Sequence, residues 1–78
     1  MFRRLFRSSP PLITSEHALA IAQRECASRG WTWREPVTIA ASRGAWHITT
    51  NAMTRGVNAR FVIDHTSGTV KQAAYLPR

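Results

Sequence analysis

One cysteine and three histidines are the residues of this chain whose types suit nucleophilic or metal chemistry. Cys26 beside His47 would form a thiol–imidazole pair, and His17, His47 and His65 would together offer three metal ligands. None of the four residues stands in a local motif for either chemistry. Cys26 also falls on the apolar side of an expected helix, where thiols are usually inert. We therefore predict neither thiol catalysis nor a metal site.

Four acidic residues supply all the carboxylates that acid–base catalysis would need. Asp64 begins an expected turn at residues 64–68, in which its side chain accepts backbone hydrogen bonds and Gly68 takes a positive φ. Glu25 falls inside the apolar stripe of the helix, where we expect an arginine of the sheet to pair with it. Glu35 stands beside a proline, so no carboxylate pair remains, and one aspartate is too few for calcium. We predict a non-enzymatic protein with no cofactor.

The basic charge of the chain indicates acidic partners. Its net charge is +7, and ten of the eleven basic residues are arginine, the other being Lys71. Guanidinium groups bind carboxylates and phosphates with two parallel hydrogen bonds, whereas an ammonium acts as a point charge. A basic domain is also typical of nucleic-acid binding, although an arginine bias can simply reflect genome composition.

Length and composition predict one small folded domain. A chain of 78 residues buries about 60% of the surface that its unfolded form exposes, and its 44% hydrophobic content argues against disorder. The single cysteine excludes an internal disulfide and fits a reducing compartment. No apolar run is long enough for a membrane helix, and the first residues lack the apolar core of a secretory signal, so we expect a cytoplasmic protein.

Residues 1–13 are expected to form a basic arm and a stiff proline linker ahead of a single domain at residues 14–78. Arg3, Arg4 and Arg7 alternate with apolar residues and are followed by a Ser-Ser-Pro-Pro segment. Such an arm can contact an anionic membrane or nucleic acid. The alternative is a terminal segment that tucks Phe2 or Phe6 against the body.

The domain itself reads as one helix followed by four strands. Thr14 or Ser15 can cap the helix, Glu16 suits its first turn and Gly30 marks its end. Alternating apolar and polar residues predict strands at residues 37–42, 45–50, about 57–64 and about 69–75, with Arg43 and its following glycine forming a turn. The fold class is therefore α+β, an N-terminal helix packed on a four-stranded antiparallel meander.

The alternation also assigns side chains to the two faces of the sheet. The face expected under the helix carries Val37, Ile39, Trp46, Ile48, Phe61, Ile63 and Val70. The open face is expected to carry Thr38, Ser42, His47, Thr49, Arg60, Asp64 and Tyr75. Trp31 and Trp33 lie ahead of the first strand and either cap the core or, with Arg34, stack nucleic-acid bases.

A polar loop at residues 50–58 joins the second and third strands and is the leading recognition element, because binding residues concentrate on loops held by rigid scaffolds. The alternative is a flexible connection whose asparagine and glycine residues only supply turn geometry. Together with the open face, this loop gives the expected partner-binding residues, which are Arg55, Arg60, His47, Asn51, Asn58, Arg43 and Tyr75.

Several segments resemble the small PepSY-type domains and the related immunity proteins of bacterial polymorphic toxin systems, which share a cystatin-like helix-on-sheet layout. They are residues 13–22, Gly30, residues 46–48 and the turn at residues 63–70, and the resemblance spans residues 13–76. Its most specific part is the aspartate-to-glycine turn, where Ser67 replaces the usual threonine. The basic charge departs from the acidic balance common among inhibitors of basic nuclease toxins.

The resemblance implies a non-enzymatic binder. PepSY modules are associated with peptidase inhibition or sensing outside the cytoplasm, and immunity proteins cover the active site of a cognate toxin. The expected cytoplasmic location favours an immunity protein whose toxin partner has an acidic surface. A basic nucleic-acid-binding module that uses the arm and the two tryptophans is the alternative, and attachment to a membrane through the arm is a third hypothesis. No pattern in the sequence predicts an oligomeric state.

Overall fold

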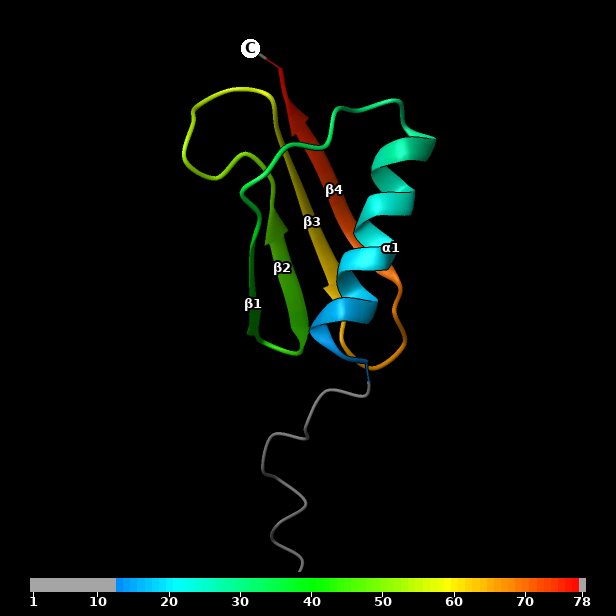
Figure 1. Ribbon diagram of the computed structural model, residues 1–78. Helices are drawn as coiled ribbons and strands as arrows, with labels where there is room; N and C mark the ends of the chain where they lie inside the picture. Colours follow the sequence, from blue (N-terminus) through cyan, green and yellow to red (C-terminus); the bar gives the residue numbers. More distant parts are fainter. Residues whose placement is uncertain (1–12, 78) are drawn as a thin grey trace, which may run out of the picture.

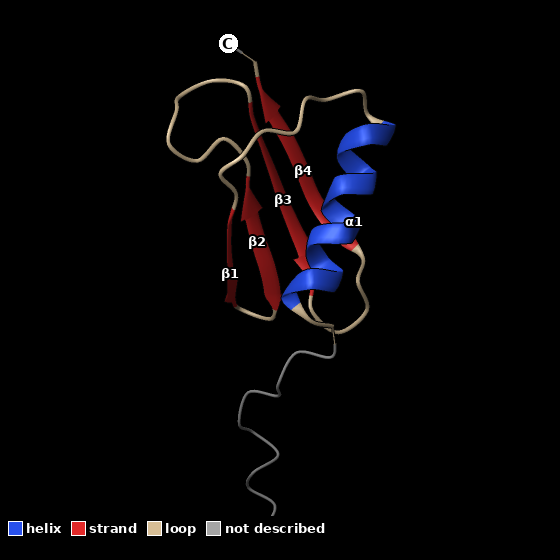
Figure 2. Ribbon diagram, viewed as in Figure 1, coloured by secondary structure: helices blue, strands red, loops and turns tan. Residues whose placement is uncertain are grey.

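One helix and four antiparallel strands form the fold, which a computed structural model describes over residues 13–77. The elements are α1 (Ser15–Ser28), β1 (Thr38–Ser42), β2 (Ala45–Thr49), β3 (Asn58–Asp64) and β4 (Val70–Leu76). The strands form one sheet in the order β1-β2-β3-β4, so each pairs with its neighbour in sequence (Figures 1 and 2). The predicted α+β meander is confirmed. Residues 1–12 of the expected arm lie outside the described residues.

Helix α1 begins and ends where its capping residues predict. The Thr14 hydroxyl accepts a hydrogen bond from the His17 backbone N–H at 3.1 Å, which satisfies one of the free donors of the first turn. At the other end, Gly30 has φ +72° and donates to the Ala27 carbonyl, while the next residue, Trp31, donates to a carbonyl one residue earlier in the helix. This pair of bonds is a Schellman motif, which closes the helix.

The first hairpin is set by a two-residue turn between β1 and β2. Arg43 and Gly44 both have positive φ angles, 53° and 79°. Two successive positive φ angles define the turn whose twist matches paired antiparallel strands. The expected turn at this position is confirmed, and it fixes a register in which Ile39 lies opposite Ile48.

The second tight turn, between β3 and β4, is organised by one carboxylate. Asp64 Oδ2 accepts from the backbone N–H of Ser67 at 2.8 Å, from its hydroxyl at 3.0 Å and from the Thr66 N–H at 3.1 Å. Gly68 has φ +80° and donates to the Asp64 carbonyl at 2.9 Å. These bonds confirm the structural role predicted for the turn.

A β-bulge follows that turn and reverses the expected faces of β4. Val62 pairs with Gln72, whereas Ile63 pairs with Val70, so Lys71 is an extra residue in β4. An extra residue moves every later side chain to the opposite face of the sheet. Tyr75 was expected on the open face, but it pairs with the buried Ala59 and therefore lies on the helix-covered side.

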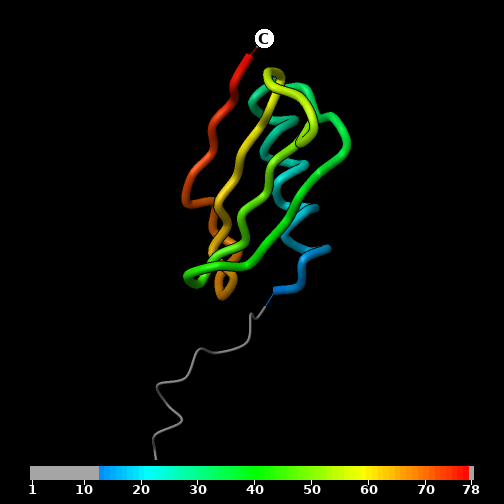
Figure 3. The backbone as a smooth tube through the Cα atoms, turned by 90° about the vertical axis from the view of Figure 1, so that its left-hand side faces the viewer, coloured from blue at the N-terminus to red at the C-terminus, as the bar shows by residue number. Residues whose placement is uncertain are grey.

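The core lies between α1 and the sheet, on the face that the alternation in the first three strands predicts. Small helix residues, Ala18, Ala22 and Cys26, bring the helix close to the larger Ile48 and Phe61 of the sheet. Figure 3 shows α1 on one side of the sheet, and none of the elements described over residues 13–77 covers the other side. Over the described residues, the second face of the sheet therefore stays open.

Two segments outside the regular elements also belong to this core. Ile13 is buried, its N–H donates to the His65 carbonyl at 3.0 Å, and its own carbonyl accepts from the Trp46 indole at 3.2 Å. Trp31 stacks on Tyr75 with ring centroids 5.3 Å apart. These contacts close the two ends of the core.

The prediction that an arginine of the sheet pairs with Glu25 was wrong. Its carboxylate pairs with the Arg29 side chain at 2.6 Å, one turn further along α1, and not with an arginine of the sheet. Because Glu25 is only half-buried at the edge of the apolar stripe, a residue four positions later reaches it from the solvent side.

Candidate functional site

The loop between β2 and β3 is held by the side chains of two asparagines. Asn51 is buried, has φ 51° and donates from its amide to the Gly56 carbonyl at 2.9 Å. The Asn58 amide donates to the carbonyls of Thr50, Asn51 and Thr54 at 2.9 to 3.1 Å, and its oxygen accepts from the Gly56 N–H at 2.7 Å. Both amides were expected to face a partner, but these bonds direct them into the loop and give it a defined shape.

The same loop is attached to the segment that leads from the helix to the sheet. The Asn51 N–H donates to the Arg34 carbonyl at 2.7 Å, and the Ala52 N–H donates to the Pro36 carbonyl at 2.9 Å. These two backbone hydrogen bonds join the first residues of the loop to the segment that leads into β1.

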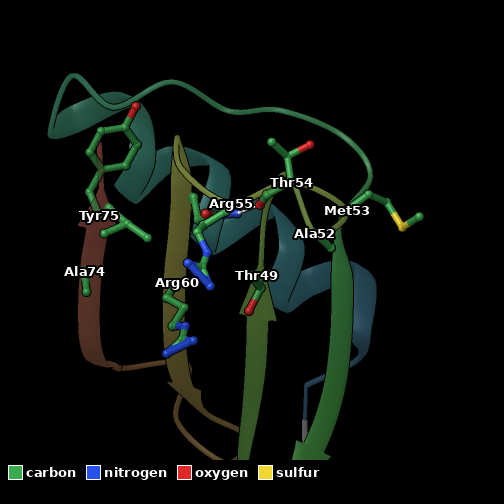
Figure 4. A pocket seen from close by; sticks show the side chains of 10 residues that line it. Thr49, Ala52, Met53, Thr54, Arg55, Arg60, Ala74 and Tyr75 are labelled. Carbon is green, nitrogen blue, oxygen red and sulfur yellow. Dashed lines mark hydrogen bonds between the residues drawn. The ribbon is translucent and has the colours of Figure 1, made fainter. Parts of the chain in front are cut away.

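A hollow of about 560 Å³ lies where this loop meets the open face of the sheet (Figure 4). It extends from the loop across β2 and β3 to β4. Its lining residues are Thr49, Ala52, Met53, Thr54, Arg55, Asn58, Arg60, Ala74, Tyr75 and Leu76.

Arg55 and Arg60 give the hollow its charge. Arg55 comes from the loop and Arg60 from β3, and Figure 4 shows both guanidinium groups over the same part of the sheet. Both residues are exposed, and no acidic residue is among the residues that line the hollow. Within residues 13–77 the single ion pair is the one between Glu25 and Arg29. The two guanidiniums therefore remain available to carboxylate or phosphate groups.

Exposed apolar side chains flank the two arginines. Met53 is 82% exposed and Leu76 is 53% exposed, and both line the hollow. Methionine and arginine are both enriched at protein interfaces, so this lining is compatible with a protein partner.

The hollow contains some of the predicted site residues and leaves others apart. It brings together the side chains of Arg55, Arg60 and Asn58, and Asn51 supports its loop. Tyr75 also borders the hollow, but its ring stacks on Trp31 on the helix-covered side. His47 is exposed on the open face outside the hollow, with its ring nitrogen 3.2 Å from the Ser42 carbonyl. Arg43 lies in the turn at the opposite end of β2.

Six lining residues are absent from the partner-binding residues that the sequence predicts. Thr49 belongs to the predicted open face, and Ala52, Met53 and Thr54 belong to the predicted recognition loop, whereas Ala74 and Leu76 of β4 were missed altogether. An exposed methionine inside a polar loop was a usable signal for Met53. Ala74 and Leu76 could not be predicted, because strict alternation from Val70 assigns them to the covered face and the bulge reverses that assignment.

The residues of the nucleic-acid hypothesis are not gathered in one place. Trp31 and Trp33 both pack on Phe61, with ring centroids 6.1 and 6.3 Å away, so the core holds these two rings. The Trp33 indole N–H is buried and has no acceptor among residues 13–77. Arg34 is exposed beside them, and Arg3, Arg4 and Arg7 lie outside the described residues.

The thiol is enclosed in the core. Cys26 is 1% exposed, its S–H donates to the Trp31 carbonyl at 3.4 Å, and burial raises the pKa of the thiol. A protonated, enclosed thiol is a poor nucleophile. Among the described residues, no three side chains of the metal-binding types lie together.

The fold and the hollow define the class of this protein as a small helix-on-sheet domain with an arginine-lined hollow on its open sheet face. Comparison with protein-family models, curated proteins and solved structures gives no match to the chain. Over residues 13–77, α1 is too short and too polar to cross a membrane.

Proposed function

We propose that this chain is a non-enzymatic immunity-type protein that neutralises a cognate bacterial toxin by covering its acidic active site. One observation carries the proposal, namely that two exposed arginines, Arg55 and Arg60, line one hollow whose lining contains no carboxylate. Such a hollow attracts an acidic surface and rejects a basic one. The resemblance of residues 13–76 to PepSY-like immunity proteins supports the same function.

In the proposed complex, Arg55 and Arg60 enter a carboxylate-lined catalytic site of the toxin. Each guanidinium forms two parallel hydrogen bonds with a carboxylate, and Met53 and Leu76 exclude water around these bonds. Neutralisation then needs no chemistry from this chain, because an occupied active site cannot bind its substrate. The encounter takes place in the cytoplasm, where an immunity protein protects the cell that makes the toxin.

Capture of the partner from the native cell tests this function. The tagged full-length chain is compared with the double variant Arg55→Glu, Arg60→Glu and with Arg24→Glu, a matched control on the exposed side of α1. We expect the wild type and the control to retain one acidic protein that arrests growth when expressed alone and is relieved by coexpression. Reversing two buried interface charges weakens binding by about 100-fold or more.

Two results would contradict the proposal. One is a partner that the double variant retains as well as the wild type does, because the arginine-lined hollow would then have no part in binding. The other is captured material that a nuclease removes and that added salt releases steeply, which would favour the nucleic-acid alternative.

A further inference from the structure

Strand β4 is a free edge of the sheet. It pairs with β3 on one side, and no described strand pairs with its other side (Figure 3). An edge strand presents a row of unpaired backbone N–H and C=O groups that can pair with a further strand. The bulge at Lys71 and the proline at position 77 interrupt regular pairing at the two ends. Residues 72–76 therefore form the regular part of this edge.

The arginine-lined hollow reaches this edge and not the other one. Ala74 and Leu76 of β4 line the hollow, whereas no residue of β1, the opposite edge strand, does so. Arg60 of β3 lies opposite Ala74 of β4. Between the Arg60 side chain and the free edge there is therefore just the methyl group of Ala74. A strand added beside β4 would lie about 10 Å from β3, within reach of a long arginine side chain across that methyl.

The helix-covered side of the same edge is aromatic. Tyr75 and Trp31 stack at 5.3 Å with an angle of 14° between their rings, and both are partly exposed. The Arg29 guanidinium lies 5.1 Å from the centre of the Trp31 ring on this side. An added strand would therefore meet arginines on one face and aromatic rings on the other.

We propose that β4 accepts an extended segment of the partner as a fifth strand, in which acidic residues alternate with apolar ones. Side chains alternate between the two faces of a strand, so acidic residues would face Arg60 and Arg55 while apolar residues would face Tyr75 and Trp31. Backbone pairing supplies affinity, and the two faces supply specificity. This inference rests on the proposed function and names the kind of surface that the acidic partner presents.

Titration of the full-length chain with a short peptide of alternating glutamate and valine tests the inference. The peptide is acetylated and amidated, and hydrogen exchange of the backbone amides is followed by NMR. We expect the amides of residues 72–76 that point to the free edge, which are every second one, to exchange at least about ten-fold more slowly when the peptide is bound, because paired edge groups leave the solvent. Arg60→Glu should weaken binding by about ten-fold or more, and Arg24→Glu should leave it unchanged.

An N-methylated form of the same peptide separates strand pairing from charge attraction. It keeps the side chains and loses the backbone donors, so we expect its binding to be about ten-fold weaker or worse. Equal binding of both peptides without slower exchange in β4 would overturn the fifth strand and leave the proposed function intact. Absence of peptide binding would also overturn the fifth strand. So would slow exchange of the β4 amides that comes from self-association of the chain in the absence of any peptide. The proposed function fails separately, in the capture experiment.

Discussion

The Asn58 side-chain amide donates to the Asn51 carbonyl across 2.9 Å and so joins the two ends of the loop that carries Arg55. Because the same amide also bonds two further carbonyls and accepts from the Gly56 N–H, its removal leaves several partly buried groups without a partner. We expect Asn58→Ala to lower the free energy of unfolding by about 2 to 3 kcal/mol. Urea denaturation of the full-length chain measures the change.

Thr54→Ala is the control for that loop. Thr54 is exposed, and its side chain makes no hydrogen bond among the described residues, so its loss should change the free energy of unfolding by less than about 0.5 kcal/mol. Equal effects of the two substitutions would show that the asparagine amide does not hold the loop together.

The faces of the sheet show how far a sequence pattern predicts this fold. Alternation assigns Ile39, Ile48 and Phe61 to the covered side correctly, because β1, β2 and the paired part of β3 are regular. The same rule fails for Tyr75, because the extra residue Lys71 reverses β4. A bulge depends on how two strands meet across the sheet, and a linear pattern of apolar residues does not contain that information.

Some residues of the candidate site were predictable from the sequence, and others were not. Arg55 and Arg60 follow from charge and from their positions on a loop and an open face, and both line the hollow. The role of Asn58 in holding the loop together could not be predicted, because its four hydrogen bonds depend on how the loop folds back on itself. Leu76 was missed because of the same bulge at Lys71 that places Tyr75 on the opposite face from the one expected.

The turn at Asp64 should make stability depend on pH. The backbone N–H of Ser67, then its hydroxyl and the Thr66 N–H, lower the pKa of the Asp64 carboxyl, and the charge of Lys71 acts in the same direction. Since the folded pKa is below the unfolded pKa of about 3.9, the contribution is complete above that pH and is lost as pH falls through the folded pKa. Asp64→Asn should be less stable than the wild type at neutral pH, and the difference should shrink in acid.

Urea midpoints of the wild type and of Asp64→Asn, measured from neutral pH down to about pH 2.5, check this dependence. Ser67→Ala removes the hydroxyl and keeps the backbone N–H, so its pH dependence should lie between the two. Parallel curves for the wild type and Asp64→Asn would mean that the carboxylate does not titrate differently on folding.

Two separate features favour glycine at position 68. Its φ of +80° is strained for any residue with a Cβ, and a Cβ there would lie 3.2 Å from Cδ1 of Ile21. Gly68→Ala should therefore destabilise the fold by about 1 to 2 kcal/mol in urea denaturation. Gly30→Ala is the matched control, since Gly30 has φ +72° and no neighbouring atom within 4 Å.

The difference between the two glycine variants isolates the contact with Ile21. A double-mutant cycle with Ile21→Val, which removes the Cδ1 atom, should reduce the cost of Gly68→Ala to that of Gly30→Ala. An unchanged cost in the Ile21→Val background would assign the whole effect to the backbone angle.

Cys26 should be unreactive in the folded protein. It is buried, its S–H is bonded to the Trp31 carbonyl, and burial raises its pKa, so a thiol reagent must wait for the helix to open. We expect a disulfide reagent at neutral pH to label Cys26 at least about 100-fold more slowly in buffer than in denaturant. Ala27→Cys in a Cys26→Ala background is the control, because position 27 is exposed and its thiol should react at nearly the same rate in both solutions. Rapid labelling of folded Cys26 would place the thiol within reach of solvent and would restore thiol chemistry as a function for this chain.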